Sequence, residues 1–380
     1  MNQKSKYLPT PLALTLCFSI LYFLLIISCV PLNFDGASAA QGAINFFKNG
    51  SLELNYRASV ELTIGLPFEI LNGFFLMLGR SMLYTNLANL VFFSTIILIC
   101  FKLATKSNSK LPYLSYLVVC LSPLTVKYAF AGYGEVPALV FCILGAFFYL
   151  NITRLKKTVF GGVLFGLGVA TKLVVLITLP ALLLAALIHK KSFRSLLIFT
   201  ATLTTSSLIV LALHYGLLAN FSLSQFLAAV IEQTNPLINH NREISSGFFL
   251  GFQSHWNSYV ISSGGEFVAL LKLLLLFPLL ATMINSNKES KNAFPAFLIL
   301  ATCIYFIWYF FFSMRVWERR FLNADILLYL SLGSIVFFTA KRSVLHLAYT
   351  AALIFLAVIN LNLAISYSKP CLKCSVSCQE

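Results

Sequence analysis

Long runs of apolar residues recur along the whole chain and are separated by charged or turn residues. A helix that crosses a bilayer takes about 20 consecutive apolar residues, so runs of about this length, and several that are shorter, indicate membrane crossings. They predict eleven transmembrane helices, over residues 10–31, 82–103, 112–130, 136–152, 158–171, 173–189, 195–215, 267–285, 294–313, 326–340 and 345–366. The expected fold class is an all-α polytopic membrane protein.

Two segments between these runs, 32–81 and 216–265, are too long to be simple connections, because structureless loops beyond about 15 residues are uncommon unless they are functional. In the first segment apolar residues recur at helical spacing, at Phe34, Ala37, Ala40, Ile44 and Phe47. This pattern predicts an amphipathic helix that lies in the membrane interface. Residues 67–79 predict a second such helix, and residues 223–232 and 246–261 predict two more.

The composition excludes the soluble classes of protein. Hydrophobic residues make up 59% of the chain and charged residues 10%, whereas soluble domains have about 45–50% and about 25%. We therefore exclude a cytosolic α/β enzyme, a disordered or collagen-like chain and a nucleic-acid-binding protein.

The formal charge of +15 follows the predicted topology. Cytoplasmic loops collect Lys and Arg, so Lys4 and Lys6 place the N-terminus in the cytoplasm. Alternation of the helices then puts basic residues in every cytoplasmic turn, at Lys102, Lys106, Lys110, Arg154, Lys156, Lys157, Lys190, Lys191, Arg194, Lys288, Lys291, Lys341 and Arg342. The expected location is the bacterial inner (plasma) membrane, or the endoplasmic reticulum membrane if the protein is eukaryotic.

The acids show the opposite bias. Every Asp and Glu except Glu289 falls on or near the outer face, including Asp325. Either the long outer loops simply carry most polar residues, or a reaction or ion site on that face uses carboxylates.

One transmembrane domain is expected over residues 1–367, with its long outer loops at 32–81 and 216–265. The remaining outer tail, 368–380, carries Cys371, Cys374 and Cys378 in a C-x2-C-x3-C spacing. Three thiols make an incomplete zinc site, and on the oxidising outer side one disulfide with a spare thiol is the alternative. The tail can also be incidental.

Two outer acids are candidates for chemistry. Asp35 starts the first interfacial helix, where a carboxylate could act as general base on an acceptor hydroxyl; the competing interpretation is helix capping. Glu135 opens the fourth predicted crossing, and two carboxylates on one face could hold a divalent cation. Glu135 can equally be a first-turn acid that complements the helix dipole.

Basic residues on the outer side are candidates for phosphate binding, since topology disfavours them there. Lys172 separates two apolar runs, and a cation at membrane depth is costly unless it pairs or contacts a headgroup. Three arginines, Arg315, Arg319 and Arg320, precede the tenth predicted crossing, and arginine binds phosphate bidentately. Snorkelling is the alternative for both sites.

The second outer loop adds His240, Arg242 and His255 as candidate substrate contacts. A histidine in such a loop can also be merely solvated.

The order of these features resembles the GT-C superfamily of membrane glycosyltransferases, especially the branch with protein O-mannosyltransferases and bacterial lipid A aminoarabinose transferases. The resemblance is carried by short motifs in a particular order: Asn33-Phe34-Asp35-Gly36, Gly134-Glu135, the segment from Gly166 to Lys172, His255 with the apolar run to Pro278, and Glu318-Arg319-Arg320-Phe321. It covers most of the chain.

The resemblance implies an enzyme that moves a sugar, with inversion, from a polyprenyl-phosphate donor to a glycan, lipid or protein acceptor on the non-cytoplasmic face. It assigns the catalytic base to Asp35 and suggests Glu135, Lys172 and Arg320 for the donor phosphate or for a divalent cation, Mg²⁺ or Mn²⁺. Nucleic acid is not an expected partner.

Two other classes stay open. A transporter or flippase of lipid-linked saccharides would place polar residues at mid-membrane, and only Lys172 and Lys272 hint at that. An O-antigen-type polymerase or ligase also uses lipid-linked sugars, but its large outer loop usually falls late in the chain.

Overall fold

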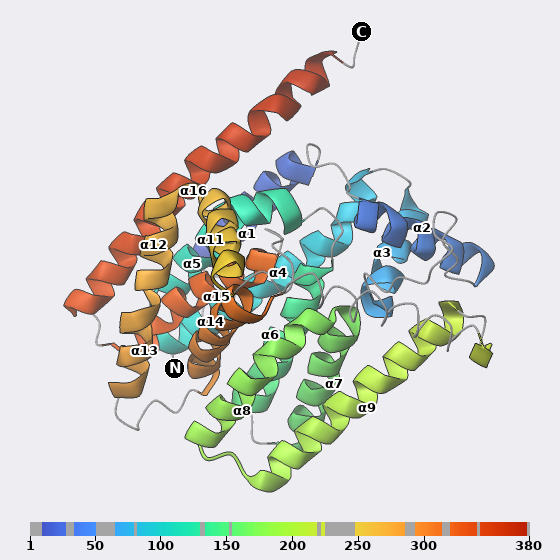
Figure 1. Ribbon diagram of the computed structural model, residues 1–380, viewed down its shortest axis with the longest axis horizontal. Coiled ribbons are helices and arrows are strands. Elements are labelled where there is room, and N and C mark those ends of the chain that lie inside the picture. Colours follow the sequence, from blue (N-terminus) through green and yellow to red (C-terminus); the bar gives the residue numbers. More distant parts are fainter. Residues whose placement is uncertain are drawn as a thin grey trace, which may run out of the picture.

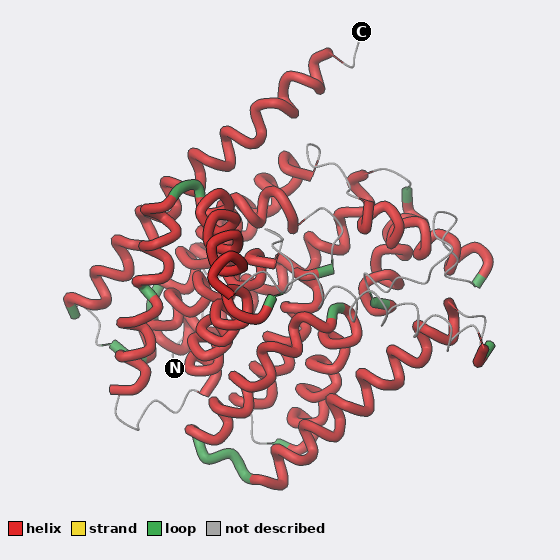
Figure 2. The backbone as a smooth tube through the Cα atoms, in the orientation of Figure 1, coloured by secondary structure: helices red, strands yellow, loops and turns green. Residues whose placement is uncertain are grey.

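The computed structural model describes residues 10–27, 34–50, 65–79, 82–129, 134–151, 154–218, 222–224, 248–285, 293–313, 320–339 and 343–377. These residues form helices joined by short turns, with no β-strand among them (Figure 2). The N-terminal helices are α1 (Thr10–Ile27), α2 (Phe34–Asn49), α3 (Leu66–Leu78), α4 (Met82–Ser107) and α5 (Leu111–Leu121), followed by a π-helix, η1 (Thr125–Ala129).

The central helices are α6 (Glu135–Asn151), α7 (Leu155–Thr171), the 3₁₀-helix η2 (Leu173–Thr178), α8 (Leu179–Ile188) and α9 (Phe193–Leu218). The C-terminal helices are α11 (Phe248–Ser263), α12 (Glu266–Leu274), α13 (Leu276–Asn285), α14 (Ala293–Phe312), α15 (Phe321–Ser334) with the 3₁₀-helix η4 (Ile335–Phe337), and α16 (Val344–Ser377).

Among the described residues, five helical segments are long and apolar enough to cross a membrane: Leu87–Ser107, Phe193–Leu217, Glu266–Asn285, Ala293–Phe312 and Val344–Ser366. The protein is therefore consistent with an all-α, membrane-embedded fold. The predicted count of eleven is not confirmed, because other predicted crossings form shorter apolar helices, such as α5 and α6, or a 3₁₀-helix continued by an α-helix, as in Leu173–Ile188.

The helices α6, α7 and α9 pack through glycine. A Cβ added to Gly145 of α6 would lie 2.6 Å from the carbonyl oxygen of Gly161, and one added to Gly166 of α7 would lie 2.0 Å from the Ser206 hydroxyl of α9. Small residues let helix backbones approach this closely, which is typical of membrane helix packing. The register makes α6 antiparallel to α7, while α9 runs parallel to α7.

This arrangement separates charge along the bundle. The basic turn of residues 154–157 begins α7, and that of residues 190–194 precedes α9, so both lie at one end of the three helices. The residues that begin α6 and end α7 lie at the opposite end, toward α2 and α3 (Figure 1).

The segment 32–81, predicted as the first outer loop, contains two helices at the expected positions. The apolar stripe predicted for 34–47 forms α2, and the segment predicted at 67–79 forms α3. The two helices pack on each other through Ala40, Ala43 and Leu76, and a Cβ on Gly73 would lie 2.7 Å from the Phe47 ring. The segment predicted at 246–261 forms α11, whereas that at 223–232 lies largely outside the described residues.

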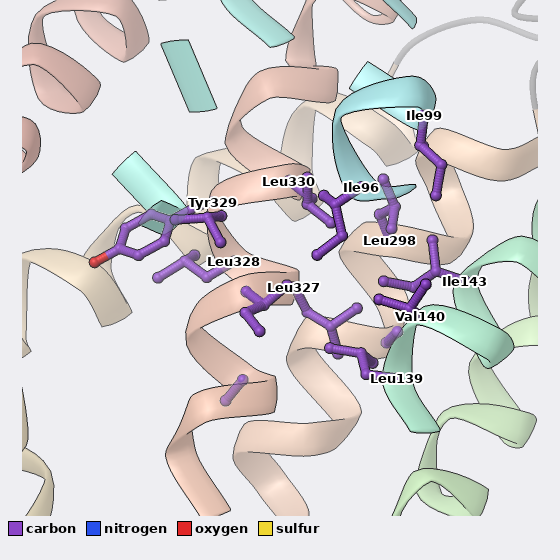
Figure 3. Close-up of a cluster of buried hydrophobic side chains, with 14 of the residues drawn as sticks. Ile96, Ile99, Leu139, Val140, Ile143, Leu298, Leu327, Leu328, Tyr329 and Leu330 are labelled. Carbon is purple, nitrogen blue, oxygen red and sulfur yellow. The ribbon is translucent and has the colours of Figure 1, made fainter. Parts of the chain in front are cut away.

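The core is centred on α15, whose residues are all buried. Figure 3 shows its leucines in contact with apolar side chains from three other helices: Ile96 and Ile99 of α4, Leu139, Val140 and Ile143 of α6, and Leu298 of α14. Arg320, a predicted site residue, is the N-cap that directly precedes this buried helix.

The helix α16 continues through Ser377 without interruption and projects beyond the other helices at its C-terminal end (Figure 1). No helix break marks the predicted boundary between residues 367 and 368. Cys371 and Cys374 belong to this helix, but their side chains lie outside the described part of the chain, as does Cys378.

Candidate functional site

The structure brings together Glu135 and Lys172, two of the predicted site residues. Glu135 starts α6, and Lys172 ends α7 in an extended conformation, with its backbone N–H still donating to the Gly168 carbonyl. The Lys172 Nζ lies 3.4 Å from Glu135 Oε1, with 17% of the lysine side chain and 5% of the glutamate side chain exposed. The pair is therefore mostly buried, with the ammonium closer to solvent than the carboxylate.

A second cation, Arg320, is linked to Glu135 through Tyr305. Arg320 precedes α15, donates to the Ser313 hydroxyl at 2.6 Å and stacks 5.5 Å from the centre of the Trp308 ring. Both Arg320 and Glu135 are close enough to the buried Tyr305 hydroxyl to act on it electrostatically.

Asn323 completes this group, because its Nδ2 donates to the Tyr305 hydroxyl at 3.2 Å. Its Oδ1 is buried without a hydrogen-bond partner among the described residues, and the same is true of Glu135 Oε2. Arg320, Asn323 and Glu135 thus act on one tyrosine hydroxyl, and Lys172 joins the group through its pair with Glu135. The two acceptor atoms without a partner among the described residues could be satisfied by a bound molecule. We call Glu135, Lys172, Tyr305, Arg320 and Asn323 the charged site.

The first outer loop is attached to the bundle next to Lys172. The Gly65 N–H donates to the Thr171 carbonyl at 2.9 Å, and the Leu66 N–H donates to Nδ1 of His214 at 2.9 Å. Position 65 has no room for a side chain, since an added Cβ would lie 1.9 Å from the Ala170 carbonyl oxygen. The start of α3 is therefore fixed against the end of α7.

A buried acid on α3 reinforces this attachment. Because Nδ1 of His214 accepts a hydrogen bond, the ring proton resides on Nε2, which lies 3.6 Å from Glu69 Oε2. Burial raises the pKa of Glu69 from 4.5 to about 8. A carboxyl in this environment favours its protonated form near neutral pH.

The other predicted site residues have different outcomes. Asp35 is the second residue of α2, but only its backbone is described, so the position of its carboxylate lies outside the described structure. Arg315, Arg319, His240 and Arg242 also lie outside the described residues.

His255 is buried in α11, with its ring edge-on to Tyr309 at a centroid distance of 4.8 Å. The alternative that His255 is a solvated loop residue is therefore wrong. It belongs to an aromatic cluster that also includes Tyr259, Phe310 and Phe321.

A second ion pair was not predicted from the sequence. Lys272 of α12 lies 2.9 Å and 3.1 Å from the two carboxylate oxygens of Asp325 of α15, and both side chains are almost fully buried. The Asp325 carboxylate lies inside the bundle, so it is a buried member of the acids predicted on or near the outer face. A lysine within an apolar run was the available signal, but nothing in the sequence identified its partner.

The described residues around Glu135 do not form a donor set for a divalent cation. Mg²⁺ and Mn²⁺ require several oxygen ligands, whereas Glu135 supplies one carboxylate with an ammonium beside it. No group of three or more His, Cys, Asp or Glu side chains that could hold a metal occurs within the described ranges.

The surface hollow lined by Pro278, Ala281, Thr282, Asn285 and Phe338 is formed at the far end of α13, away from the charged site.

No protein-family model matches the chain, and no characterised protein matches it in sequence.

Proposed function

We propose that the protein is a GT-C-type membrane glycosyltransferase that moves a sugar from a polyprenyl-phosphate donor to a glycan, lipid or protein acceptor. The observation that carries this proposal is that Glu135, which pairs with Lys172, and Arg320 both act on the Tyr305 hydroxyl, at the bundle end opposite the basic turns. Ammonium and guanidinium groups suit a phosphate. The phosphate of a lipid-linked donor lies at the membrane surface, where side chains at the end of a helix bundle can contact it.

The reaction follows from these positions. An acceptor hydroxyl attacks the anomeric carbon of the sugar, and the bond between that carbon and the phosphate oxygen breaks with its electron pair on the polyprenyl phosphate. Lys172 and Arg320 stabilise the charge that develops on this leaving phosphate. The hydroxyl proton passes to the Asp35 carboxylate, and attack opposite the leaving group inverts the anomeric carbon.

The docking of the first outer loop supports a role for Asp35. Asp35 belongs to α2, α2 packs on α3, and α3 is fixed beside Lys172 through Gly65 and Thr171. The loop that carries the proposed base is thus attached to the element that carries a proposed phosphate ligand.

Glu135 serves this reaction by holding Lys172. Its carboxylate orients the ammonium in a mostly buried position, 3.4 Å away. The described residues of the charged site do not fit a metal, so no step uses one. We further propose eleven membrane crossings with the N-terminus in the cytoplasm of a bacterium, because each predicted crossing contains a helix or a pair of consecutive helices.

The test uses purified protein in detergent or nanodiscs with a panel of polyprenyl-phosphate sugars. We expect one member to release free polyprenyl phosphate in the presence of an acceptor extract, and Lys172→Met to reduce that release. As a matched control, Lys48→Met removes an exposed lysine from the last turn of α2 and should leave release unchanged. No release from any donor would contradict the proposal.

A second candidate is a transporter or flippase of lipid-linked saccharides, favoured by the ion pair between Lys272 and Asp325 inside the bundle. Ionisable residues within membrane segments often mark transport pathways. Proteoliposomes with a fluorescent lipid-linked sugar distinguish the two. Translocation of intact donor without release of free carrier would favour the transporter.

A further inference from the structure

The pair formed by Lys272 and Asp325 is built as a closed polar node. The ammonium contacts both carboxylate oxygens and lies 3.5 Å from the Ser263 hydroxyl, while the Ser122 hydroxyl donates to Asp325 Oδ2 at 3.0 Å. The side chains of the pair are 0% and 1% exposed. Each charge is thus matched by an opposite charge and by at least one hydroxyl.

Aromatic rings surround the same ammonium. The Tyr329 ring centre lies 5.5 Å and the Tyr259 ring centre 6.0 Å from Lys272 Nζ, distances at which a ring attracts a cation. The Tyr329 hydroxyl also accepts from Asn360 of α16 at 3.2 Å. Side chains from α5, α11, α12, α15 and α16 therefore meet at this node.

Stability alone does not explain such a node. Desolvation of two charges offsets most of their attraction, and replacing a buried pair by apolar residues of similar size is often neutral or stabilising. A lysine in an apolar helix also makes membrane insertion of α12 and α13 less favourable. Ion pairs of this kind are best attested as devices that fix one register between elements.

The elements fixed by this node lead directly to the charged site. Asp325 lies five residues after Arg320 on α15, about 7.5 Å along the helix axis. Between them, Asn323 donates to Tyr305. The position of Asp325 along the bundle therefore sets the position of two groups of the charged site.

The other contacts of the node reach the same site from different directions. Ser122 ends α5 just before η1, which leads to the start of α6 at Glu135. Ser263 ends α11, and the turn that follows uses Gly264 and Gly265 at φ values of +85° and +134°, which only glycine adopts readily. The node thus ties the start of α15 to the end of α5 and to the turn between α11 and α12.

We propose that Lys272 and Asp325 are positioning residues, which hold Arg320 and Asn323 at the distance from Glu135 and Lys172 that the donor phosphate requires. This inference rests on the proposed glycosyltransferase function for its kinetic consequences but not for its structural ones. Neither residue touches the substrate, and both act through the placement of α15.

Three variants test the pair. Asp325→Asn leaves the lysine charge uncompensated, Lys272→Asp with Asp325→Lys reverses the pair, and Lys272→Met with Asp325→Leu replaces it by apolar side chains. The last variant keeps the test valid if the first fails to fold, because it buries no unpaired charge.

The matched control removes a different buried contact of α15. The Thr302 and Ser331 hydroxyls lie 2.9 Å apart between α14 and α15, far along the helix from Arg320. Thr302→Val with Ser331→Ala should lower thermal stability without changing the charged site.

Two readouts separate positioning from stability. The first is the KM for the polyprenyl-phosphate donor, which we expect to rise at least 10-fold in Asp325→Asn and in the apolar variant, with a smaller change in kcat. The second is Trp308 fluorescence, because Arg320 stacks on that ring. The chain has three tryptophans, so Trp256→Phe and Trp317→Phe leave Trp308 as the only emitter.

We expect the emission of Trp308 to shift in the apolar variant, to return toward the unmodified value in the reversed pair, and to stay unchanged in the control. An apolar variant with unaltered emission and donor KM would overturn the inference, as would an equal shift in the control. If the unmodified protein releases no carrier at all, the glycosyltransferase proposal fails, while the emission of Trp308 still decides whether the pair positions Arg320.

Discussion

Replacement of Lys172 by Met provides the sharpest test of the charged site, because it has two separable consequences. The change removes an ammonium but keeps an unbranched apolar side chain at the end of α7. It leaves Glu135, whose side chain is 5% exposed, without the cation 3.4 Å away. It also removes one of the two cations proposed to contact the donor phosphate.

The expected loss of stability follows from the ion-pair distance. Two unit charges 3.4 Å apart attract by about 5 kcal/mol at an effective dielectric constant of about 20. Breaking a buried pair by removing one partner typically costs about 3–5 kcal/mol. We expect about 3 kcal/mol here, the lower end of that range, because the lysine side chain is 17% exposed.

The expected loss of donor binding is estimated from the phosphate contact. A hydrogen bond to a charged group contributes about 1.5–3 kcal/mol, which corresponds to an increase of about 10- to 150-fold in the donor KM. The two losses have different origins. The first comes from an unpaired carboxylate, and the second from a missing phosphate ligand.

The double variant Glu135→Gln with Lys172→Met separates these origins. Without the carboxylate no charge is left unpaired, so the thermal unfolding temperature should return close to that of the unmodified protein. The donor KM should stay raised, because the cation is still absent. Carrier release is measured at several donor concentrations, and unfolding in the same detergent.

A double variant with an unmodified donor KM would refute the assignment of Lys172 to the phosphate. An equal rise in KM for Lys48→Met, which removes an exposed lysine of α2, would show that net charge and not this site controls binding.

Three further predictions concern the first outer loop. Asp35→Asn should reduce carrier release by about 10²- to 10⁴-fold with unchanged donor binding. The control Glu266→Gln changes an exposed acid that starts α12 and should keep activity. Equal effects of the two changes would show that Asp35 is not the base. Burial raises the pKa of Glu69 from 4.5 to about 8, so the folded state binds the proton more tightly and docking of α3 should weaken as pH rises between these values. Hydrogen exchange of the α3 amides measures this, and a slope retained in Glu69→Gln would contradict the cause. Gly65→Ala should release α3 from the end of α7, because the added Cβ would lie 1.9 Å from the Ala170 carbonyl oxygen. Protease protection of α3 measures this, and unaltered protection would show that other contacts hold the loop.

The positions of the helices were predictable where apolar runs end at residues that stop a helix. The predicted division at Lys172 is confirmed, because α7 ends at Thr171 and η2 starts at Leu173. The expected helices at 34–47 and 67–79 are likewise present as α2 and α3. Periodicity and helix breaks are local properties, so the sequence expresses them directly.

Helix boundaries that were predicted from charged residues agreed less well with the structure. The tenth crossing was predicted to begin at 326, after Asp325, but α15 begins at Phe321. The prediction treated a charged residue as the end of an apolar segment. In the structure the carboxylate is neutralised by Lys272, which lies 53 positions earlier in the chain, so the helix continues through it inside the bundle.

Part of the charged site was also within reach of the sequence. The helices α6 and α7 are consecutive, antiparallel and 17 residues long each, and Glu135 begins the first while Lys172 follows the last residue of the second. Antiparallel helices of equal length bring such residues to the same end. The contact between Glu69 and His214 had no such signal, because it depends on how α3 docks against α9.

Among the described residues, the Lys272–Asp325 and Lys172–Glu135 pairs differ in ways that support different proposed tasks. Asp325 and Lys272 are held at 2.9 Å, fully buried and surrounded by hydroxyls, so a substrate finds no unsatisfied group there. Glu135 and Lys172 are 3.4 Å apart and partly open on the lysine side, and Glu135 Oε2 has no hydrogen-bond partner within the described structure. An ion pair with a longer distance and an oxygen that lacks a hydrogen-bond partner can rearrange when a phosphate binds. An ion pair whose hydrogen bonds are all made holds its helices in place. This contrast supports the proposed roles, phosphate binding for the pair of Glu135 and Lys172 and positioning for the pair of Asp325 and Lys272.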